Sequence, residues 1–119
     1  MNMKILKTYS RVYTSDINKT ITFYQNLTGQ KVFQHFQLPK MNVEVAYIGD
    51  FIIISGEGEI MNHFRKVHSS CIVEGIEKIK SYLMEQKSTV FLDLQNIPTG
   101  RNMIIQHPDG IVIEYLELK

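Results

Sequence analysis

The closing stretch of the chain, "HPDGIVIEYLEL" at residues 107–118, decides the fold class and raises the main functional question. Proline followed two residues later by glycine indicates a tight turn, and the apolar run after it indicates a strand. Successive strand residues point to opposite faces, so Glu114 shares a face with Val112 and Leu116. A carboxylate between two aliphatic residues is costly unless it has a partner. The role of Glu114 is therefore the central question.

Composition limits the classes of function. A chain of 119 residues has the length of one domain and can bury a core without disulfides. The net charge of +1 gives no indication of a nucleic-acid partner, and no apolar run approaches the ~20 residues of a membrane span. The single cysteine, Cys71, excludes an internal disulfide, and "MNMKILKTYS" has no signal-peptide pattern. We therefore expect a cytoplasmic protein that binds neither nucleic acid nor membrane.

The first half of the chain predicts a strand, a helix and three further strands. Residues 9–14 form a first stretch with apolar Tyr9, Val12 and Tyr13, and Ser15-Asp16 after it are favourable helix N-cap residues. The segment "INKTITFYQNLTG", residues 17–29, has apolar residues at helical spacing and ends in a C-cap glycine. The runs "KVFQHFQL", "VEVAYIG" and "FIIIS" then read as strands, with a hairpin at Gly49-Asp50.

The second half repeats this order. "HSSCIVEG" predicts a strand, "IEKIKSYLMEQK" a helix, and "TVFLDLQ", "NMIIQ" and "IVIEYLEL" three more strands. An offset of 59 places Ile17 on Ile76, and one residue more places Asp50 on Gly110. The repeat is too long for a solenoid. It predicts a single domain, residues 1–119, built from two βαβββ modules at about 5–58 and about 67–119.

Two motifs stand out: Asp16, Phe23, Tyr24 and Gly29 form the first, and the "PDGIVIE" segment, residues 108–114, forms the second. Both resemble motifs of the vicinal oxygen chelate superfamily, which includes glyoxalases, bleomycin resistance proteins and extradiol dioxygenases. With the module order, the resemblance covers the chain from about residue 9 to 118. It implies an α+β fold in which two βαβββ modules form curled mixed sheets around a cavity, as in glyoxalase and the bleomycin resistance protein.

The resemblance also implies positions for metal ligands. In the metalloenzyme members, each module supplies one ligand near the start of its first strand and one on its last strand. His68 and Glu114 match these positions in the second module, whereas the offsets place Tyr9 and Ile54 at them in the first. Isoleucine cannot bind a metal, and a catalytic zinc usually has three protein ligands. We therefore expect no cofactor, although a divalent metal at His68 and Glu114 stays possible.

Two interpretations of Glu114 are open. It can belong to a paired polar core with His68 or Tyr9, or it can line a ligand cavity and act as a general base. Arg101 either reaches an anionic group of the ligand or is a surface cation. Tyr47 either forms an aromatic wall or packs against a helix. The full candidate set for ligand binding is Tyr9, Tyr47, Ile54, His68, Arg101 and Glu114, with Glu114 as the candidate catalytic residue.

The leading functional hypothesis is a glyoxalase/bleomycin resistance-like protein that binds a small molecule, without the complete family metal site. One alternative is a metal-dependent lyase, isomerase, thiol transferase or dioxygenase-like member of the superfamily. Another is a resistance protein that sequesters a drug. We also expect a homodimer, because the connection "GEGEIMNHF", residues 56–64, is long enough to let a module reach a partner chain.

Overall fold

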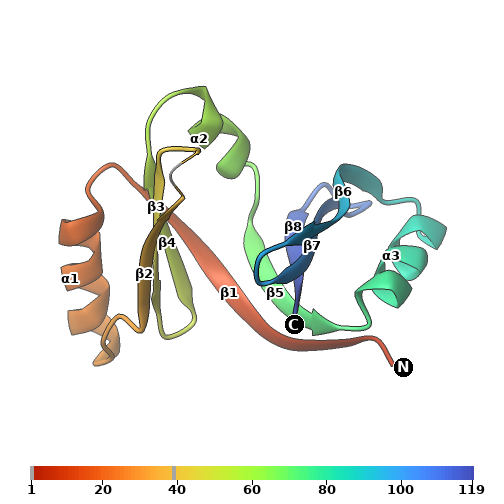
Figure 1. The fold of residues 1–119 in the computed structure, drawn as a ribbon, viewed down its shortest axis with the longest axis horizontal. Helices are drawn as coiled ribbons and strands as arrows, with labels where there is room; N and C mark the ends of the chain where they lie inside the picture. Colours follow the sequence, from red (N-terminus) through yellow and green to blue (C-terminus); the bar gives the residue numbers. More distant parts are fainter. Residues whose placement is uncertain (1, 39) are drawn as a thin grey trace. The chain divides into compact units, whose positions relative to one another are not determined.

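The computed structural model describes residues 2–38 and 40–119. The described residues form eight strands and three helices, in the order βαβββ, α, βαβββ (Figure 1). The chain divides into two compact units. The first unit is Tyr9–Lys66, and the second unit is Val67–Lys119 together with residues 2–8. The first strand, β1 (Lys4–Thr14), therefore contributes to both units.

The first unit is a four-stranded sheet with strand order β2-β3-β4-β1. β4 pairs with β1 in parallel, whereas β3 pairs with β2 and β4 in antiparallel fashion. Besides β1, its elements are α1 (Ile17–Thr28), β2 (Gln34–Leu38), β3 (Val43–Ile48), β4 (Phe51–Gly56) and α2 (Glu59–Phe64).

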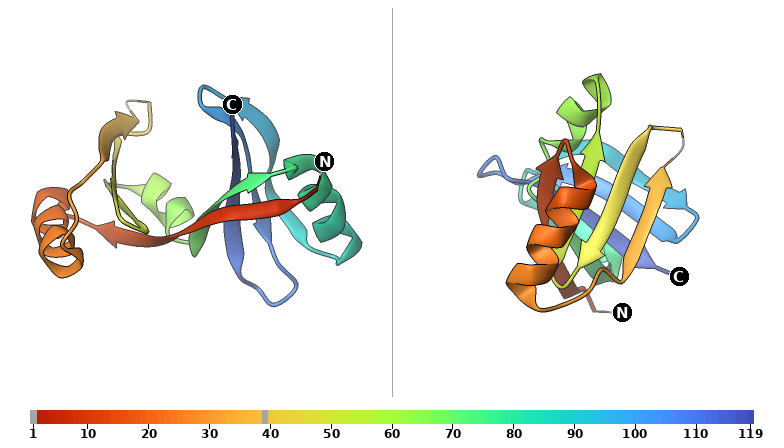
Figure 2. Two further views of the ribbon diagram at one scale, coloured as in Figure 1. Left: turned by 90° about the horizontal axis from the view of Figure 1, so that it is seen from below. Right: turned by 90° about the vertical axis from the view of Figure 1, so that its left-hand side faces the viewer.

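The helix α1 begins and ends where its capping residues predict. The Asp16 side chain accepts a hydrogen bond from the Lys19 N–H at 3.1 Å, and Gly29 ends the helix with a left-handed φ of 70°. Ile17 and Ile21 pack against a set of buried sheet residues, Ala46, Ile48 and Ile53. α1 therefore covers one face of the sheet (Figure 2). We call the face away from the helix the distal face.

The second unit repeats the plan, with strand order β5-β8-β7-β6 and β5 parallel to β8. α3 covers one face of this sheet (Figure 1), and its Ile76, Ile79 and Leu83 pack over Met103 and Tyr115. The expected α+β fold of two βαβββ modules is confirmed. The elements of this unit are β5 (Ser69–Glu74), α3 (Ile76–Glu85), β6 (Thr89–Ile97), β7 (Gly100–Gln106) and β8 (Val112–Leu118).

The short helix α2 lies in the segment that sequence patterns describe only as a connection between modules. Glu59 stands in its first turn, which suits the positive end of a helix dipole. Met61 is buried, at 3% exposure, and the helix contacts β4. Six residues are too few to show an apolar periodicity, so this helix gives no signal in the sequence.

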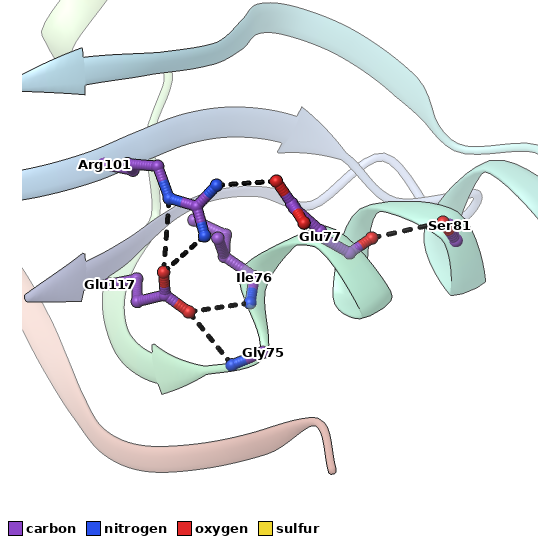
Figure 3. A network of polar contacts seen from close by, with 6 residues as sticks. All are labelled: Gly75, Ile76, Glu77, Ser81, Arg101 and Glu117. Atoms are coloured by element: carbon purple, nitrogen blue, oxygen red, sulfur yellow. Dashed lines mark hydrogen bonds and ion pairs between the residues drawn. The ribbon is translucent and has the colours of Figure 1, made fainter. Parts of the chain in front are cut away.

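A carboxylate from β8 caps the N-terminus of α3 (Figure 3). The helix begins after Gly75, which has no side chain to cap it. Instead, one carboxylate oxygen of Glu117, Oε2, accepts from the N–H groups of Gly75 and Ile76 at 3.0 and 3.1 Å. These two N–H groups belong to the helix end that lacks partners within the helix. Glu117 thereby joins α3 to the sheet.

Arg101 on β7 holds Glu117 in this position. Its Nε and Nη2 donate to Glu117 Oε1 at 3.2 and 2.6 Å, and its Nη1 donates to Glu77 Oε1 at 2.7 Å. The hydrogen bond from Arg101, with that from the Ile76 N–H, lowers the pKa of Glu117. A lowered pKa in the folded state means that the contact stabilises the fold while Glu117 is ionised.

Replacing Glu117 by glutamine should change how stability depends on pH. The folded-state pKa is below the ordinary value of about 4.3, so the stabilisation is fully present above that pH and is lost as pH falls through the folded-state pKa. Glu117→Gln should lower the free energy of unfolding at pH 7 by about 1 kcal/mol, the scale of a lost cap. Once the pH has fallen below the folded-state pKa of Glu117, the two proteins should converge. Urea unfolding between about pH 3 and 7 measures this.

The control is Glu74→Gln, which removes a charge from an exposed residue at the same end of α3. It should leave the pH profile of stability like that of the wild type. Parallel profiles for the wild type and Glu117→Gln would contradict a stabilising role of the Glu117 carboxylate.

Gly100 should tolerate no side chain. A Cβ atom there would lie 1.9 Å from the backbone oxygen of Glu117, and the φ of 154° is already unusual. Gly110 has a φ of 94°, but a Cβ atom at this position would meet no other atom within 4 Å. Gly100→Ala should therefore destabilise by at least about 2 kcal/mol more than Gly110→Ala. Chemical denaturation of both variants measures the difference, and equal losses would contradict the close approach.

Candidate functional site

Four polar side chains form a chain of hydrogen bonds across the distal face of the second unit, one from each strand. Ser70 Oγ on β5 donates to Glu114 Oε1 on β8 at 2.8 Å. Asn102 Nδ2 on β7 donates to Glu114 Oε2 at 3.2 Å, and Gln95 Nε2 on β6 donates to Asn102 Oδ1 at 3.1 Å. We call this set the polar ladder. Ser70 and Asn102 are 2% and 8% exposed, and Glu114 is half-buried.

Strand alternation places Glu114 in this ladder. Its neighbours Ile113 and Tyr115 pack in the core under α3, so Glu114 must point to the other face. Ser70 and Glu114 are paired residues of the parallel β5–β8 register and therefore share that face. β8 lies between β5 and β7, so Glu114 stands on a central strand, and its direction is the one that the parity of the sequence predicts.

The partners that the structure provides for Glu114 are ones that sequence reasoning missed. That reasoning named His68, but Ser70 and Asn102 donate to the two carboxylate oxygens. One signal was present in the sequence: Ser70 lies two residues after His68 in the same strand-like run. Asn102 and Gln95 gave none, because their position depends on how β6 and β7 pair.

His68, just before β5, takes part in a different contact. Its ring Nδ1 accepts a hydrogen bond from the backbone N–H of Val112 at 3.2 Å. Because Nδ1 acts as the acceptor, a neutral ring carries its proton on Nε2. Histidines that bind a metal usually donate a hydrogen bond from the nitrogen that does not face the metal. In this arrangement His68 presents Nε2–H as a donor and not as a metal ligand.

The contacts of His68 and Glu114 within the second unit can be compared with what a metal ion needs. In the described part of the chain, no three side chains of His, Cys, Asp or Glu gather within one unit as a metal would require. Both oxygens of Glu114 accept hydrogen bonds in the polar ladder. The contacts of His68 and Glu114 within the second unit therefore fit hydrogen bonding better than an ion, and we derive no chemical step through a metal.

Aromatic side chains gather on the distal face of the first unit. Tyr9 and Tyr47 meet edge to face, with ring centroids 5.2 Å apart. The Tyr47 ring also lies 5.8 Å from Phe33 and 6.3 Å from Phe36, with which it is stacked. Because Ala46 and Ile48 pack under α1, Tyr47 points away from that helix. Of the two roles considered for Tyr47, this position suits an aromatic wall.

The strand register identifies a different residue of the first unit as the counterpart of Glu114. Ser70 pairs with Glu114, and the offset of 59 carries Ser70 onto Arg11. Arg11 pairs with Ile52, so the residue in the place of Glu114 is Ile52 and not Ile54, two residues further on. Both isoleucines are buried on the same strand face. Either way, the first unit has no carboxylate at this place.

Arg101 lies on the face opposite the polar ladder. Its neighbour Asn102 belongs to the ladder, so alternation directs Arg101 to the α3 side, where Glu117 and Glu77 bind it. Beside it is a groove of about 580 Å³, lined by Glu74, Gly75, Ile76, Glu77, Lys78, Arg101, Glu117 and Leu118. The lining holds more carboxylates than cations. This lining does not favour the binding of an anionic ligand group by Arg101, which was one of the two roles considered for it.

Two further groups with reactive chemistry belong to the core under α3. Burial raises the pKa of the Cys71 thiol, which contacts the Thr8 hydroxyl. Burial also raises the pKa of Tyr115 to about 12, and its hydroxyl lies 2.5 Å from His107 Nε2. Both groups stay protonated at neutral pH, so neither is an activated nucleophile.

None of the helices described has the length and apolar character needed to cross a lipid bilayer.

Comparisons with known proteins identify relatives of this chain in sequence and in structure. No protein-family model matches the chain. An uncharacterized protein from Methanosarcina mazei has a crystal structure that matches with a TM-score of 0.83 and 34% identity, covering 98% of this chain and 94% of that one. The uncharacterized protein YwbC of Bacillus subtilis (strain 168) is 24% identical over 92% of this chain and 94% of its own length.

Methylmalonyl-CoA epimerases share the fold. The enzyme from Streptomyces coelicolor, in complex with 2-nitronate-propionyl-CoA, matches with a TM-score of 0.74 and 14% identity, covering 97% of this chain and 96% of that one. Methylmalonyl-CoA epimerase is a vicinal oxygen chelate protein. The chain therefore belongs to one family with the Methanosarcina mazei protein, and it shares its fold with methylmalonyl-CoA epimerase.

Proposed function

We propose that this protein binds a small organic molecule on the distal face of the second unit, with Glu114 as the central polar contact. The observation that carries the proposal is the polar ladder: a half-buried carboxylate on a central strand, held at both oxygens by Ser70 and Asn102. Buried polar groups that only satisfy one another are seldom stabilising relative to apolar packing. A set of hydrogen-bonded polar side chains that extends over four strands is better explained by a ligand that forms hydrogen bonds with it.

The ladder suits hydrogen bonding to a ligand and, with a suitable substrate, proton transfer. Ser70 and Asn102 fix the orientation of the Glu114 carboxylate, and a preorganised group loses little freedom when a ligand arrives. A carboxylate so placed can accept a hydrogen bond from a ligand or take a proton from it as a general base. His68 Nε2–H, two residues before Ser70, offers a donor for the same ligand. This chemistry needs no metal.

Coenzyme A thioesters are the first ligand class to test. The epimerase of Streptomyces coelicolor that shares this fold was crystallised with such a compound. We therefore propose a screen that contains propionyl-coenzyme A together with small acids and alcohols, followed by amide NMR. The amide signals that shift should belong to the distal-face residues of β5, β7 and β8.

The decisive variant is Glu114→Gln. Its amide can occupy the ladder with its oxygen toward the Ser70 hydroxyl if Asn102 and Gln95 both turn their amides over, so that the bonds of Asn102 to residue 114 and to Gln95 reverse direction. The fold should therefore survive, with an unfolding midpoint close to that of the wild type. Ligand affinity should fall at least about tenfold, because the change removes the charge and one acceptor. Titration calorimetry with the best compound of the screen measures this.

Two controls separate the explanations. Glu85→Gln removes a charge from an exposed residue at the end of α3 and should bind as the wild type does. Treatment with a chelator should also leave binding unchanged, whereas loss of binding would support the metal-dependent alternative. Equal affinity of the wild type and Glu114→Gln would reject the proposed role of Glu114.

We also propose that the chain forms a homodimer through a sheet edge. β2 and β6 end the strand orders of their units, and both expose aromatic side chains: Phe36 is 40% and Phe91 48% exposed. Exposed edges with apolar side chains pair readily with another chain. β6 is the longer of the two strands, with nine residues against five, and we expect the contact there.

Light scattering at micromolar concentration should give twice the chain mass of 13.8 kDa. Phe91→Lys should reduce the mass to that of a monomer, because a charge would have to be buried in the contact. The matched control is Phe23→Lys on the exposed side of α1, where the side chain is 59% exposed. It should remain a dimer. A wild-type monomer would refute the proposal.

A further inference from the structure

We propose that a polar pocket at one end of the first unit's sheet binds a small primary amine that also carries hydroxyl groups. The pocket has a volume of about 240 Å³, and its lining belongs to the first unit alone. We call it the hairpin pocket, because it lies at the ends of the paired strands β2, β3 and β4. Five of its lining residues are polar: Gln37, Asn42, Glu44, Ser55 and Glu57.

Strand pairing brings three of these side chains into one row. Glu44 on β3 pairs with Gln37 on β2 and with Ser55 on β4, and paired residues of neighbouring strands share a face. Glu44 lies two residues before Ala46, which packs under α1, so the row is on the α1 side of the sheet. Ala46 is fully buried, whereas Glu44 and Ser55 are half-buried. The row therefore lies at the margin of the area that the helix covers, where a ligand can reach it from solvent.

Two further polar side chains join the lining from the segments next to the row. Asn42 directly precedes β3 and has a left-handed φ of 52°, which asparagine adopts more readily than most residues with a side chain. Glu57 directly follows β4. A Cβ atom at Gly56 would lie 3.2 Å from the backbone oxygen of Asn42, so the two segments are close together. The lining thus comes from two turns and three strands that the hairpin holds in register.

The polar groups of the hairpin pocket have few partners in the part of the chain that the structure describes. Among the described residues, Glu44 is the only one of the five whose side chain makes a hydrogen bond: its Oε2 lies 2.5 Å from Nε2 of His35. This contact orients the Glu44 carboxylate and engages one of its oxygens. The remaining polar atoms of the five side chains form no hydrogen bond with one another, so they can bind a ligand.

The charges of the lining favour a cation. The lining contains two carboxylates, Glu44 and Glu57, and no cationic side chain among its described residues. Even if His35 beside Glu44 is protonated, two negative charges and one positive charge leave a sum of −1. Carboxylates form their strongest hydrogen bonds with charged donors such as an ammonium group. The pocket therefore suits a protonated amine better than an acid.

The neutral polar groups require more than an amine. Gln37, Asn42 and Ser55 each carry both a hydrogen-bond donor and an acceptor. A simple alkyl ammonium offers nothing to their donors, whereas a ligand hydroxyl group accepts as well as donates. An amine with several hydroxyl groups, such as an amino sugar, satisfies both the carboxylates and these three residues.

The test uses glucosamine as the probe, at about pH 6.5, where an amine of this kind is mainly protonated. An ionic strength of about 0.1 M limits attraction between distant charges. Amide NMR titration of the full chain should show saturable shifts at the start of β3 and at the end of β4. Glucose lacks the charge and cyclohexylamine lacks the hydroxyl groups, so each should bind at least about fivefold more weakly than glucosamine.

Two variants remove one charge each and keep the shape of the side chain. Glu44→Gln should weaken glucosamine binding at least about tenfold, and Glu57→Gln, at an exposed position, at least about threefold. The matched control is Glu59→Gln, which removes a charge from an exposed residue two positions beyond Glu57 that does not line the pocket. Its affinity should stay within about 1.5-fold of the wild type.

Several results would overturn the inference. These are the absence of saturable glucosamine binding, wild-type affinity in Glu57→Gln, or an equal loss in Glu59→Gln. Glucose binding as tight as glucosamine would reject the need for a cation, and equally tight cyclohexylamine binding would reject the role of the hydroxyl groups. If Glu44→Gln fails to fold, Glu57→Gln decides alone, because its side chain is exposed. No residue of the polar ladder takes part, so this proposal and the one for Glu114 fail independently.

Discussion

Burial of apolar side chains beneath one helix is the constraint on which each unit depends. In the second unit, Ile113 and Tyr115 must lie under α3, where each buried side chain of this size contributes about 1.5–3 kcal/mol. Because a strand alternates, this choice directs Glu114 to the distal face. A slip of β8 by one residue would put Glu114 under the helix and Tyr115 outside it. The place of the candidate carboxylate is thus a consequence of how the core packs.

The same alternation gives the two glutamates of β8 opposite surroundings. Glu114 and Glu117 are three residues apart and so lie on opposite faces. Glu117, on the helix side, caps α3 and binds Arg101, whereas Glu114, on the distal side, binds Ser70 and Asn102. One carboxylate stabilises the fold, and the other is the one for which we propose a ligand. The sequence offers both as charges in an apolar strand and does not distinguish them by composition.

Periodicity was sufficient to predict the fold, but not the partners within it. The repeat of helix and strand patterns predicts both modules, and strand parity predicts the direction of Glu114. The partners depend on register, which has no local signal. Gln95 faces Asn102 because β6 shifts register at two places, between Val90 and Leu92 and between Leu92 and Gln95. An offset between the two halves of the sequence likewise contains no information on how β1 pairs with β4. It gives Ile54 as the counterpart of Glu114, whereas the strand register gives Ile52.

The two units differ most on their distal faces. Under each helix both sheets bury aliphatic residues, because any loss there would cost stability directly. On the distal faces the corresponding residues Ser70 and Arg11 differ in charge and size, and the place of Glu114 is occupied by Ile52. A repeated module is free to diverge wherever packing does not restrict it. Divergence concentrated on one face of each sheet therefore favours function on that face, where we propose the Glu114 carboxylate as the central contact of the second unit.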